Sequence, residues 1–257
     1  MIKLEKTVKP SPDQWDAVIR GMRNAMNSWD RMDSFVCRED DDNIETCHNC
    51  PKWNFCDVTD KDDRYILGPN DKGLMMRLAK GGPVHAKYRR MITVYVDITA
   101  PLYWWKEFDT YRVGVYENPT EIEMNSCSTM HKIHAKEFTR DDFSIEDLFG
   151  EGVVPDHVDE NPYDIMDLTI GCLNYLREEY LNTKNKIYWR NMIQTLPSSY
   201  NQKRTLMLNY EVLNNIYHSR KNHKLDEWRE VCKWIEGLPH SEIIIGEKKN
   251  DQKESEQ

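Results

Sequence analysis

The sequence predicts a single α+β domain over residues 1–245, followed by a charged, disordered tail at 246–257. Two observations predict this class. Apolar residues alternate with polar ones in a few short segments, as in half-buried strands, and recur at helical spacing in longer segments. These strands and helices do not alternate regularly, which distinguishes the pattern from a doubly wound α/β fold. The 257 residues are enough to bury a large core.

The first third of the chain predicts two helices separated by an irregular insertion. A capping serine, a proline and an acid at residues 11–13 open a helix whose apolar positions recur to residue 29. Residues 37–73 are acidic, contain four cysteines and show little periodicity, so we expect an irregular insertion there. A short helix over 74–80 follows, and the Gly-Gly-Pro at 81–83 ends it.

The middle of the chain predicts one clear strand. Ile92 to Thr99 alternates apolar and polar side chains, and Ala100-Pro101 ends this strand and starts a helix that reaches about Arg112. A polar loop is expected over 115–124, and a second irregular acidic stretch reaches about residue 162.

The C-terminal third predicts four helices and one strand. Long helices are expected over 163–181 and 184–196, a short strand over 203–209, and further helices over 210–221 and 225–237.

Charge and hydropathy exclude several classes of function. The formal net charge of −9 argues against binding of nucleic-acid polymers, which requires a basic surface. No apolar run approaches the roughly 20 residues that span a membrane, and the N-terminus lacks the apolar segment of a signal peptide. We therefore expect a soluble cytoplasmic protein. Trp104 and Trp105 suggest a stacking platform, but a buried helix face is the better expectation.

Cysteines at 37, 47, 50 and 56 form a C-x9-C-x2-C-x5-C cluster inside the insertion. In a reducing compartment, clustered thiols are more often metal ligands than disulfides. We expect Cys37, Cys47, Cys50 and Cys56 to bind Zn²⁺ or an iron–sulfur cluster, with His48 as an alternative ligand. Four independent thiols in a loop are the alternative. A metal would supply folding energy that this weakly apolar segment lacks.

Arg220 lies in the last turn of a predicted helix that is otherwise patterned for burial. A guanidinium on the buried side needs an anionic partner, either a carboxylate of the protein or a phosphorylated ligand. His218, Arg220, His223 and Lys224 form a basic cluster at this helix end. Favourable placement against the helix dipole and an anion site both explain the cluster.

Three stretches carry motif-like residues in chain order: ITAPLYWWKEFDTYRVG, NSCSTMH, and the C-terminal stretch from Leu196 to Arg220. Together they resemble the flavin-dependent thymidylate synthases. ITAPLYWWKEFDTYRVG resembles the end of that family's strand and its R-Q-x-x-R-H-R-x-x-S helix, and NSCSTMH at residues 125–131 resembles N-E-x-S-x-R-Y. The C-terminal stretch matches the family's L-P, Asn and L-R at their offsets, with Leu196, Pro197, Asn209, Leu213 and Arg220. His85 resembles the histidine that precedes the family's first long strand.

The resemblance implies an antiparallel sheet packed with long helices, a homotetramer, and binding of FAD and dUMP. It implies that reduced flavin relays a methylene group from methylene-tetrahydrofolate to C5 of the uracil ring, where it becomes a methyl group, and that a reduced nicotinamide cofactor supplies the electrons. His85, Arg112 and Asn209 would contact the flavin. Ser128 and Arg220 would act in catalysis and bind the nucleotide, and Lys203 or Arg204 would make the second anion contact.

Several positions depart from the family pattern. Lys106-Glu107 replaces Arg-Gln, Thr110-Tyr111 replaces the Arg-His that precedes Arg112, and Ser126, Met130 and His131 replace Glu, Arg and Tyr. Loss of the charge at Met130 alone would weaken dUMP binding by about tenfold to a hundredfold. A catalytically altered relative, kept as a nucleotide-binding or interaction protein with a structural metal, is therefore the alternative.

Overall fold

The computed structural model describes residues 2–37, 65–111, 123–127, 129–146, 148 and 161–246. The chain divides into two compact units. The first unit comprises Met1–Lys6, Val96–Val113 and Glu123–Leu206, and the second comprises Thr7–Tyr95, Gly114–Ile122 and Met207–Gln257.

The fold is α+β, as the sequence predicts. Its main sheet has the strand order β1-β4-β6-β5, formed by β1 (Lys3–Val8), β4 (Thr93–Pro101), β6 (Asn201–Asn209) and β5 (Glu123–Ser126). Hydrogen bonds from Tyr210 N to Ile92 O and from Leu102 N to Tyr200 O, both 3.0 Å, show that β4 and β6 run antiparallel. The sequence reading missed β1 and β5.

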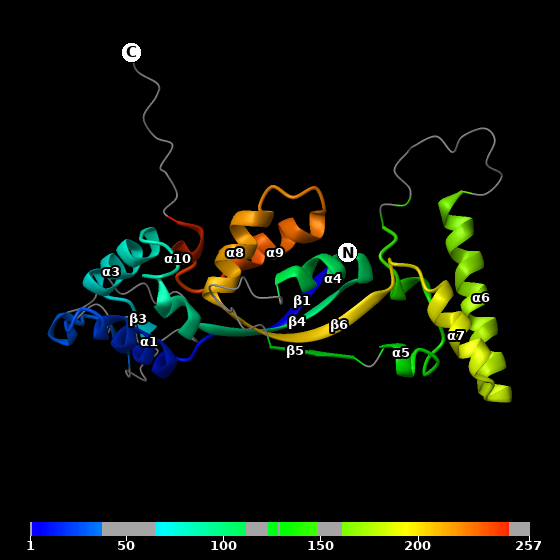
Figure 1. Cartoon of the computed structure of the whole chain (residues 1–257). Helices are drawn as coiled ribbons and strands as arrows, with labels where there is room; N and C mark the ends of the chain where they lie inside the picture. Colours follow the sequence, from blue (N-terminus) through cyan, green and yellow to red (C-terminus); the bar gives the residue numbers. More distant parts are fainter. Residues whose placement is uncertain are drawn as a thin grey trace, which may run out of the picture. The chain divides into compact units, whose positions relative to one another are not determined.

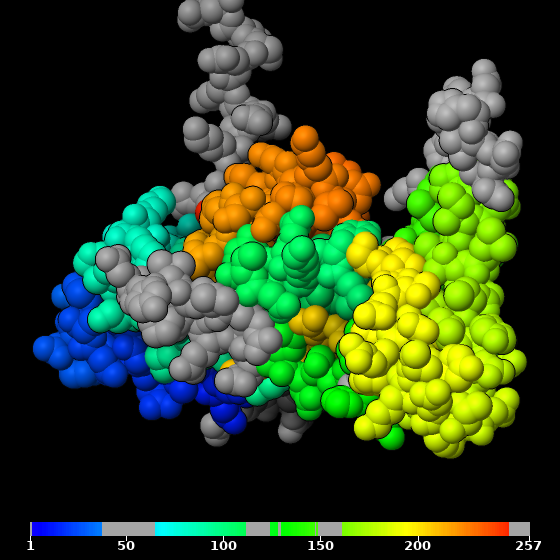
Figure 2. Space-filling model, turned by 45° about the vertical axis from the view of Figure 1, so that its right-hand side comes forward, coloured from blue at the N-terminus to red at the C-terminus, as the bar shows by residue number. Residues whose placement is uncertain are grey.

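A helical hairpin forms the core of the first unit. α6 (Pro162–Thr183) begins at the capping residue Asn161, and α7 (Lys186–Thr195) begins at Asn185. Lys184 adopts the left-handed conformation between them, at φ 53°. The two helices lie side by side (Figures 1 and 2). Both helices contribute to one buried hydrophobic cluster, which comprises Ile133, Phe138, Phe143, Leu173, Leu176 and Met192.

α4 (Leu102–Phe108) buries its aromatic face, as the sequence predicts. Trp104, Trp105 and Phe108 are each no more than 1% exposed, and Trp104 stacks on Phe108 with 5.1 Å between ring centroids. α4 ends at Phe108 and continues as a 3-10 turn, η4 (Asp109–Tyr111), rather than as the expected helix to residue 112. Two other short helical segments in this unit are α5 (Thr129–Lys132) and η5 (Arg140–Asp142).

The first helix of the second unit is shorter than expected. α1 (Pro12–Asn24) starts at the predicted capping residue Ser11, which forms a capping box with Gln14, but it ends before Trp29. Asn27 takes a positive φ of 46°, and a 3-10 turn, η1 (Trp29–Arg31), follows. Met26 and Trp29 are 60% and 53% exposed, so the apolar pattern beyond residue 24 does not face the core.

α3 (Pro69–Lys80) begins five residues before the expected helix at residue 74, inside the segment expected to be irregular. β2 (Phe35–Val36) pairs antiparallel with β3 (Tyr65–Ile66), which places Phe35 opposite Ile66. The end of the segment expected to be irregular, residues 37–73, therefore carries regular structure, because β3 begins at Tyr65 and α3 at Pro69.

The rest of the second unit is helical. η3 (Lys87–Met91) precedes β4, and α8 (Tyr210–Arg220), α9 (Asp226–Glu236) and α10 (Glu242–Ile245) follow β6. α10, which the sequence reading missed, packs against α8 and α3 (Figure 1). Trp15 is fully buried here, 6.2 Å from the ring of Tyr65 and 6.0 Å from that of Tyr210. Among the described residues, no helix combines the length and hydropathy needed to cross a membrane.

Candidate functional site

The stretch from β6 to the end of α8 carries most of the predicted site residues that the structure describes. β6 carries Lys203, Arg204 and Asn209, and α8 ends at Arg220. Lys203 and Arg204 belong to the first unit, whereas Asn209 and Arg220 belong to the second.

Lys203 forms ion pairs on the exposed side of β6. Its Nζ lies 3.1 Å from Asp97 Oδ2 and 3.5 Å from Glu5 Oε2. The hydrogen bond to Asp97 holds the pKa of Lys203 above its ordinary value. Hydrogen bonds from Thr205 and Lys203 hold the pKa of Asp97 below its ordinary value. Lys203 is therefore a charged, solvent-accessible group that already has carboxylate partners.

Arg204 lies on aromatic and polar partners instead. Its guanidinium lies 4.1 Å above the Trp105 ring and donates to Gln202 Oε1 at 2.9 Å and to Asp109 Oδ1 at 3.1 Å. The side chain of Arg204 is only 12% exposed, whereas that of Asp109 is 46% exposed. An anionic ligand that reaches Arg204 would compete with a carboxylate that is free to move into solvent.

Asn209 caps α8. Its Oδ1 accepts hydrogen bonds from the backbone N of Glu211 at 3.1 Å and of Val212 at 3.0 Å, and the residue is 8% exposed. The side-chain oxygen thus satisfies the helix N-terminus. The amide nitrogen of Asn209 is the side-chain group that could donate a hydrogen bond to a ligand.

A buried ion pair that the sequence reading missed lies beside this cap. Arg89 Nη1 is 3.5 Å from Glu211 Oε2, and the two residues are 6% and 1% exposed. Arg89 also donates to the carbonyl of Ile243 in α10. No local pattern in the sequence joins Arg89 to Glu211, because the two residues are far apart along the chain.

Arg220 lies over an aromatic ring at the C-terminal end of α8. Its guanidinium is 4.7 Å from the ring centroid of Trp228, and the residue is half-buried. Of its basic neighbours, His218 Nε2 lies 3.1 Å from Ile244 O, and His223 Nδ1 accepts from Leu225 N at 3.2 Å. Both histidines therefore have structural roles, and the 11-residue α8 places Arg220 about 16 Å from Asn209.

His85 is exposed in the turn after α3, where its ring faces Gly81. A Cβ at Gly81 would lie 3.1–3.2 Å from that ring. Arg112 and Ser128 lie outside the described residues, as do Cys47, Cys50 and Cys56. Cys37 is described and half-buried. Within the described part of the chain, no group of three or more potential ligands could hold a metal ion.

A cavity of about 660 Å³ lies within the first unit, and it includes none of the predicted site residues. Its lining carries charges of both signs, with Lys3 and Arg140 against Asp141 and Glu146. Arg140 donates to Asp167 through Nε and Nη2 and to Tyr163, so its guanidinium is already occupied.

No protein-family model and no curated protein sequence matches the chain. The structure is similar to thymidylate synthase X (ThyX) from Helicobacter pylori with FAD and dUMP, at a TM-score of 0.52 and 15% identity over 94% of each chain. A second structure of the flavin-dependent thymidylate synthase ThyX from Helicobacter pylori gives 0.51 and 15%, over 95% of this chain and 97% of that one.

It is also similar to the UMP/dUMP methylase PolB from Streptomyces cacaoi bound with 5-Br dUMP. That similarity has a TM-score of 0.51 and 14% identity, over 92% of this chain and 88% of the methylase. At these identities the similarity shows the fold alone. The α+β chain therefore has the fold of the flavin-dependent thymidylate synthases.

Proposed function

We propose that the protein binds FAD and a pyrimidine nucleotide such as dUMP, and transfers a one-carbon group to C5 of the uracil ring. Methylene-tetrahydrofolate would be the donor and a reduced nicotinamide cofactor the reductant. The observation that carries the proposal is the ThyX-like fold over 94% of the chain. Leu196, Pro197, Asn209, Leu213 and Arg220 add support, because they keep the family's offsets within the matched stretch.

Two described residues, Asn209 and His85, could donate hydrogen bonds to a flavin ring. Asn209 has its oxygen on the α8 backbone, which leaves its amide nitrogen to donate to a flavin carbonyl. His85 is exposed, so a ligand can reach its imidazole. Reduced FAD, when bound, would supply the relay of the one-carbon group. The chain's own residues would hold and orient the ring system.

The nucleotide phosphate would take a cationic partner from the end of α8. Arg220 has a planar guanidinium that can bind a phosphate through two hydrogen bonds, and Trp228 fixes its plane from one side. The resemblance also assigns an anion contact to Lys203 or Arg204 of the first unit, which would bind an anion in exchange for Asp97 or Asp109. The resemblance also assigns Ser128 to the nucleotide.

An exposed apolar stripe on α6 supports the proposed homotetramer. Ile165, Leu168 and Tyr175 are 51%, 65% and 59% exposed, and Cys172 lies on the same side of the helix. Their spacing of three, four and three residues keeps them on one face of α6. Large apolar side chains that gather in this way are typical of protein–protein interfaces.

A catalytically altered, nucleotide-binding relative is the second candidate. Met130 stands where the resemblance places an arginine, and its backbone carbonyl accepts a hydrogen bond from Trp189 Nε1 at 3.0 Å. This residue thus anchors α7 and supplies no positive charge. The missing charge would weaken dUMP binding, and methylation would be weakened or lost with it.

Visible absorption and a C5-tritium assay separate the two candidates. The protein purified without oxygen would be incubated with FAD, desalted and scanned before and after dithionite. Bleachable flavin bands together with tritium release from [5-³H]dUMP would support the enzyme. Flavin binding without tritium release would support the altered relative. A chain that stays colourless after incubation with FAD would refute the flavoprotein proposal.

Arg220→Ala tests the nucleotide site, with Lys221→Ala as its control because Lys221 is the exposed next residue. We expect Arg220→Ala to weaken dUMP binding about tenfold or more, since a hydrogen bond to a charged group contributes roughly 1.5–3 kcal/mol. Titration calorimetry measures that affinity. Unchanged dUMP binding with a large loss of thermal stability would instead show that Arg220 serves only the packing on Trp228.

A further inference from the structure

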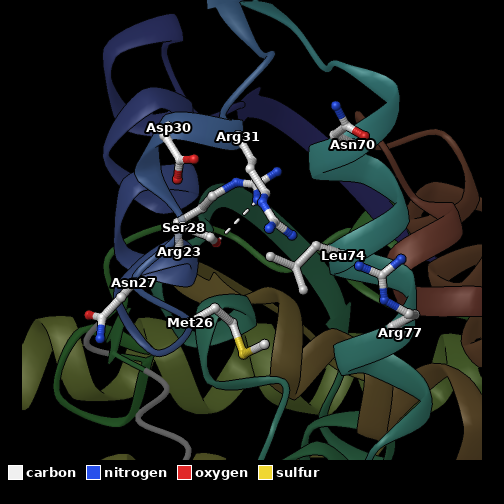
Figure 3. Close-up of a pocket in the computed structure, with 9 residues that line it drawn as sticks. All are labelled: Arg23, Met26, Asn27, Ser28, Asp30, Arg31, Asn70, Leu74 and Arg77. Carbon is white, nitrogen blue, oxygen red and sulfur yellow. Dashed lines mark hydrogen bonds between the residues drawn. The ribbon is translucent and has the colours of Figure 1, made fainter.

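A cavity of about 620 Å³ lies within the second unit, against α1, η1 and α3. Three arginines line it, one from each of these elements: Arg23, Arg31 and Arg77 (Figure 3). The acid among the lining residues is Asp30. The lining therefore carries more positive than negative charge.

Arg23 has an unmet hydrogen-bond donor. Its side chain is only 4% exposed. Nε donates to Asp71 Oδ1 at 2.6 Å and Nη1 donates to Ser28 Oγ at 3.2 Å, but the buried Nη2 has no partner. The other oxygen of Asp71 already accepts from Asp33 N, Ser34 N and Ser34 Oγ. A buried guanidinium nitrogen left without an acceptor is unfavourable.

The other two arginines leave their charges exposed. Arg31 and Arg77 are exposed, and no described residue forms an ion pair with either. In the view of Figure 3, the side chain of Leu74 is drawn between Arg77 and the neighbouring pair Arg23 and Arg31, and all four residues line the same cavity. Cations that converge on one cavity repel each other unless an anion lies between them. An anion with several oxygens would satisfy Nη2 of Arg23 and neutralise the exposed pair.

We propose that this cavity binds a phosphorylated small molecule, with its phosphate on Arg23, Arg31 and Arg77. Planar guanidinium groups suit phosphate oxygens because they bind them in pairs of hydrogen bonds. The volume exceeds that of a bare phosphate, and Met26, Leu74 and the amide of Asn70 would contact the organic part. None of these residues belongs to the proposed flavin or nucleotide site. The inference therefore does not rest on the proposed function.

The test uses the full chain without FAD or dUMP, and inorganic phosphate as the probe. Phosphate at saturation should raise the melting temperature by about 5 °C relative to sodium chloride of equal ionic strength. Arg31→Ala combined with Arg77→Ala should weaken phosphate binding at least about a hundredfold in titration calorimetry, since each arginine contributes about tenfold. Arg23→Ala is unsuitable because it would leave Asp71 buried and unpaired.

Arg20→Ala is the matched control. Arg20 lies on α1 outside the cavity and pairs with Asp16 at 2.8 Å, so this variant should bind phosphate as the wild type does. Equal stabilisation by chloride and phosphate would overturn the proposal, as would a double variant that binds phosphate normally. Tighter binding of citrate than of phosphate would overturn the assignment to a phosphate group. FAD binding by the double variant should remain unchanged, which separates this site from the proposed function.

Discussion

Asp33 and Asp71 each accept a hydrogen bond from the other's backbone. Asp33 Oδ1 accepts from Asp71 N, and Asp71 Oδ2 accepts from Asp33 N, both at 3.0 Å. Asp33 Oδ2 also accepts from Asn70 N at 2.8 Å, so a residue from a distant segment caps the start of α3. Because Asp71 also binds Arg23, this exchange fixes η1, α1 and α3 around the arginine-lined cavity.

Gly68→Ala should destabilise the protein, because Gly68 lies against the Asp33 cap. A Cβ at Gly68 would lie 2.3 Å from Asp33 Cγ and 2.6 Å from its backbone carbon. We expect a loss of about 1–3 kcal/mol in the free energy of unfolding, measured by urea denaturation. Gly171→Ala in α6 is the control, since nothing lies within 4 Å of its Cβ, and it should stabilise by roughly 0.5–1 kcal/mol. Equal effects of both changes would show that the cap tolerates a methyl group.

Asp71→Asn should remove a source of acid sensitivity. Burial raises the pKa of the Asp71 carboxyl, but hydrogen bonds from Ser34 and Arg23 outweigh burial and hold this pKa below its ordinary value. A depressed carboxyl pKa stabilises the fold above about pH 4, and this stabilisation is lost as the pH falls further. The wild type should therefore lose more stability than Asp71→Asn between pH 5 and pH 3.

At neutral pH, Asp71→Asn should lower the free energy of unfolding by about 3–5 kcal/mol, since it leaves Arg23 buried without its ionic partner. Asp16→Asn is the comparison. Its partner Arg20 has a side chain that is 61% exposed, so the expected change is below about 1 kcal/mol. Unfolding curves at both pH values measure the two effects. Similar losses for both variants would contradict a special role for Asp71.

Apolar periodicity and boundary residues predicted one strand and one helix of the fold closely. The strand at 92–99 and the helix at 210–221 agree with β4 (Thr93–Pro101) and α8 (Tyr210–Arg220) to within two residues. In both elements, side-chain periodicity and the residue at the boundary indicate the same type of secondary structure and nearly the same ends. β1 was missed because most of its residues are exposed, which leaves no apolar alternation to detect. α3 was placed late because Pro69 and Asp71, which mark its start, were assigned to the irregular insertion, and because its cap, Asp33, comes from elsewhere in the sequence.

The same limit applies to the candidate site. The sequence identified Asn209 and Arg220 by their offsets, but it did not show that Asn209 caps α8 or that Arg220 lies over Trp228. The pair of Arg23 and Asp71 joins residues 48 positions apart, and no periodicity or motif connects them. Their cavity therefore became visible only in the folded chain.

Asn209→Ser should separate the capping role of Asn209 from its proposed role in flavin binding. Serine accepts the same backbone hydrogen bonds, so this variant should unfold with nearly wild-type stability, whereas Asn209→Ala should lose about 1 kcal/mol. Both variants lack the amide donor and should bind FAD several-fold more weakly, as measured by flavin fluorescence. If Asn209→Ser binds FAD normally, the side chain serves the helix alone.

The cysteines of the insertion should bind about one zinc ion or one iron–sulfur cluster per chain. β2 and β3 hold Val36 opposite Tyr65, so the residues that flank 38–64 lie close together. Because this loop is already closed, less chain entropy is lost when Cys37, Cys47, Cys50 and Cys56 bind one metal site. Elemental analysis and visible absorption of protein purified without oxygen measure the metal. Changing Cys47 and Cys50 to serine should abolish binding, whereas Cys172→Ser, an exposed cysteine on α6, should retain it. Wild-type protein that contains neither zinc nor iron would leave the four thiols without a metal role.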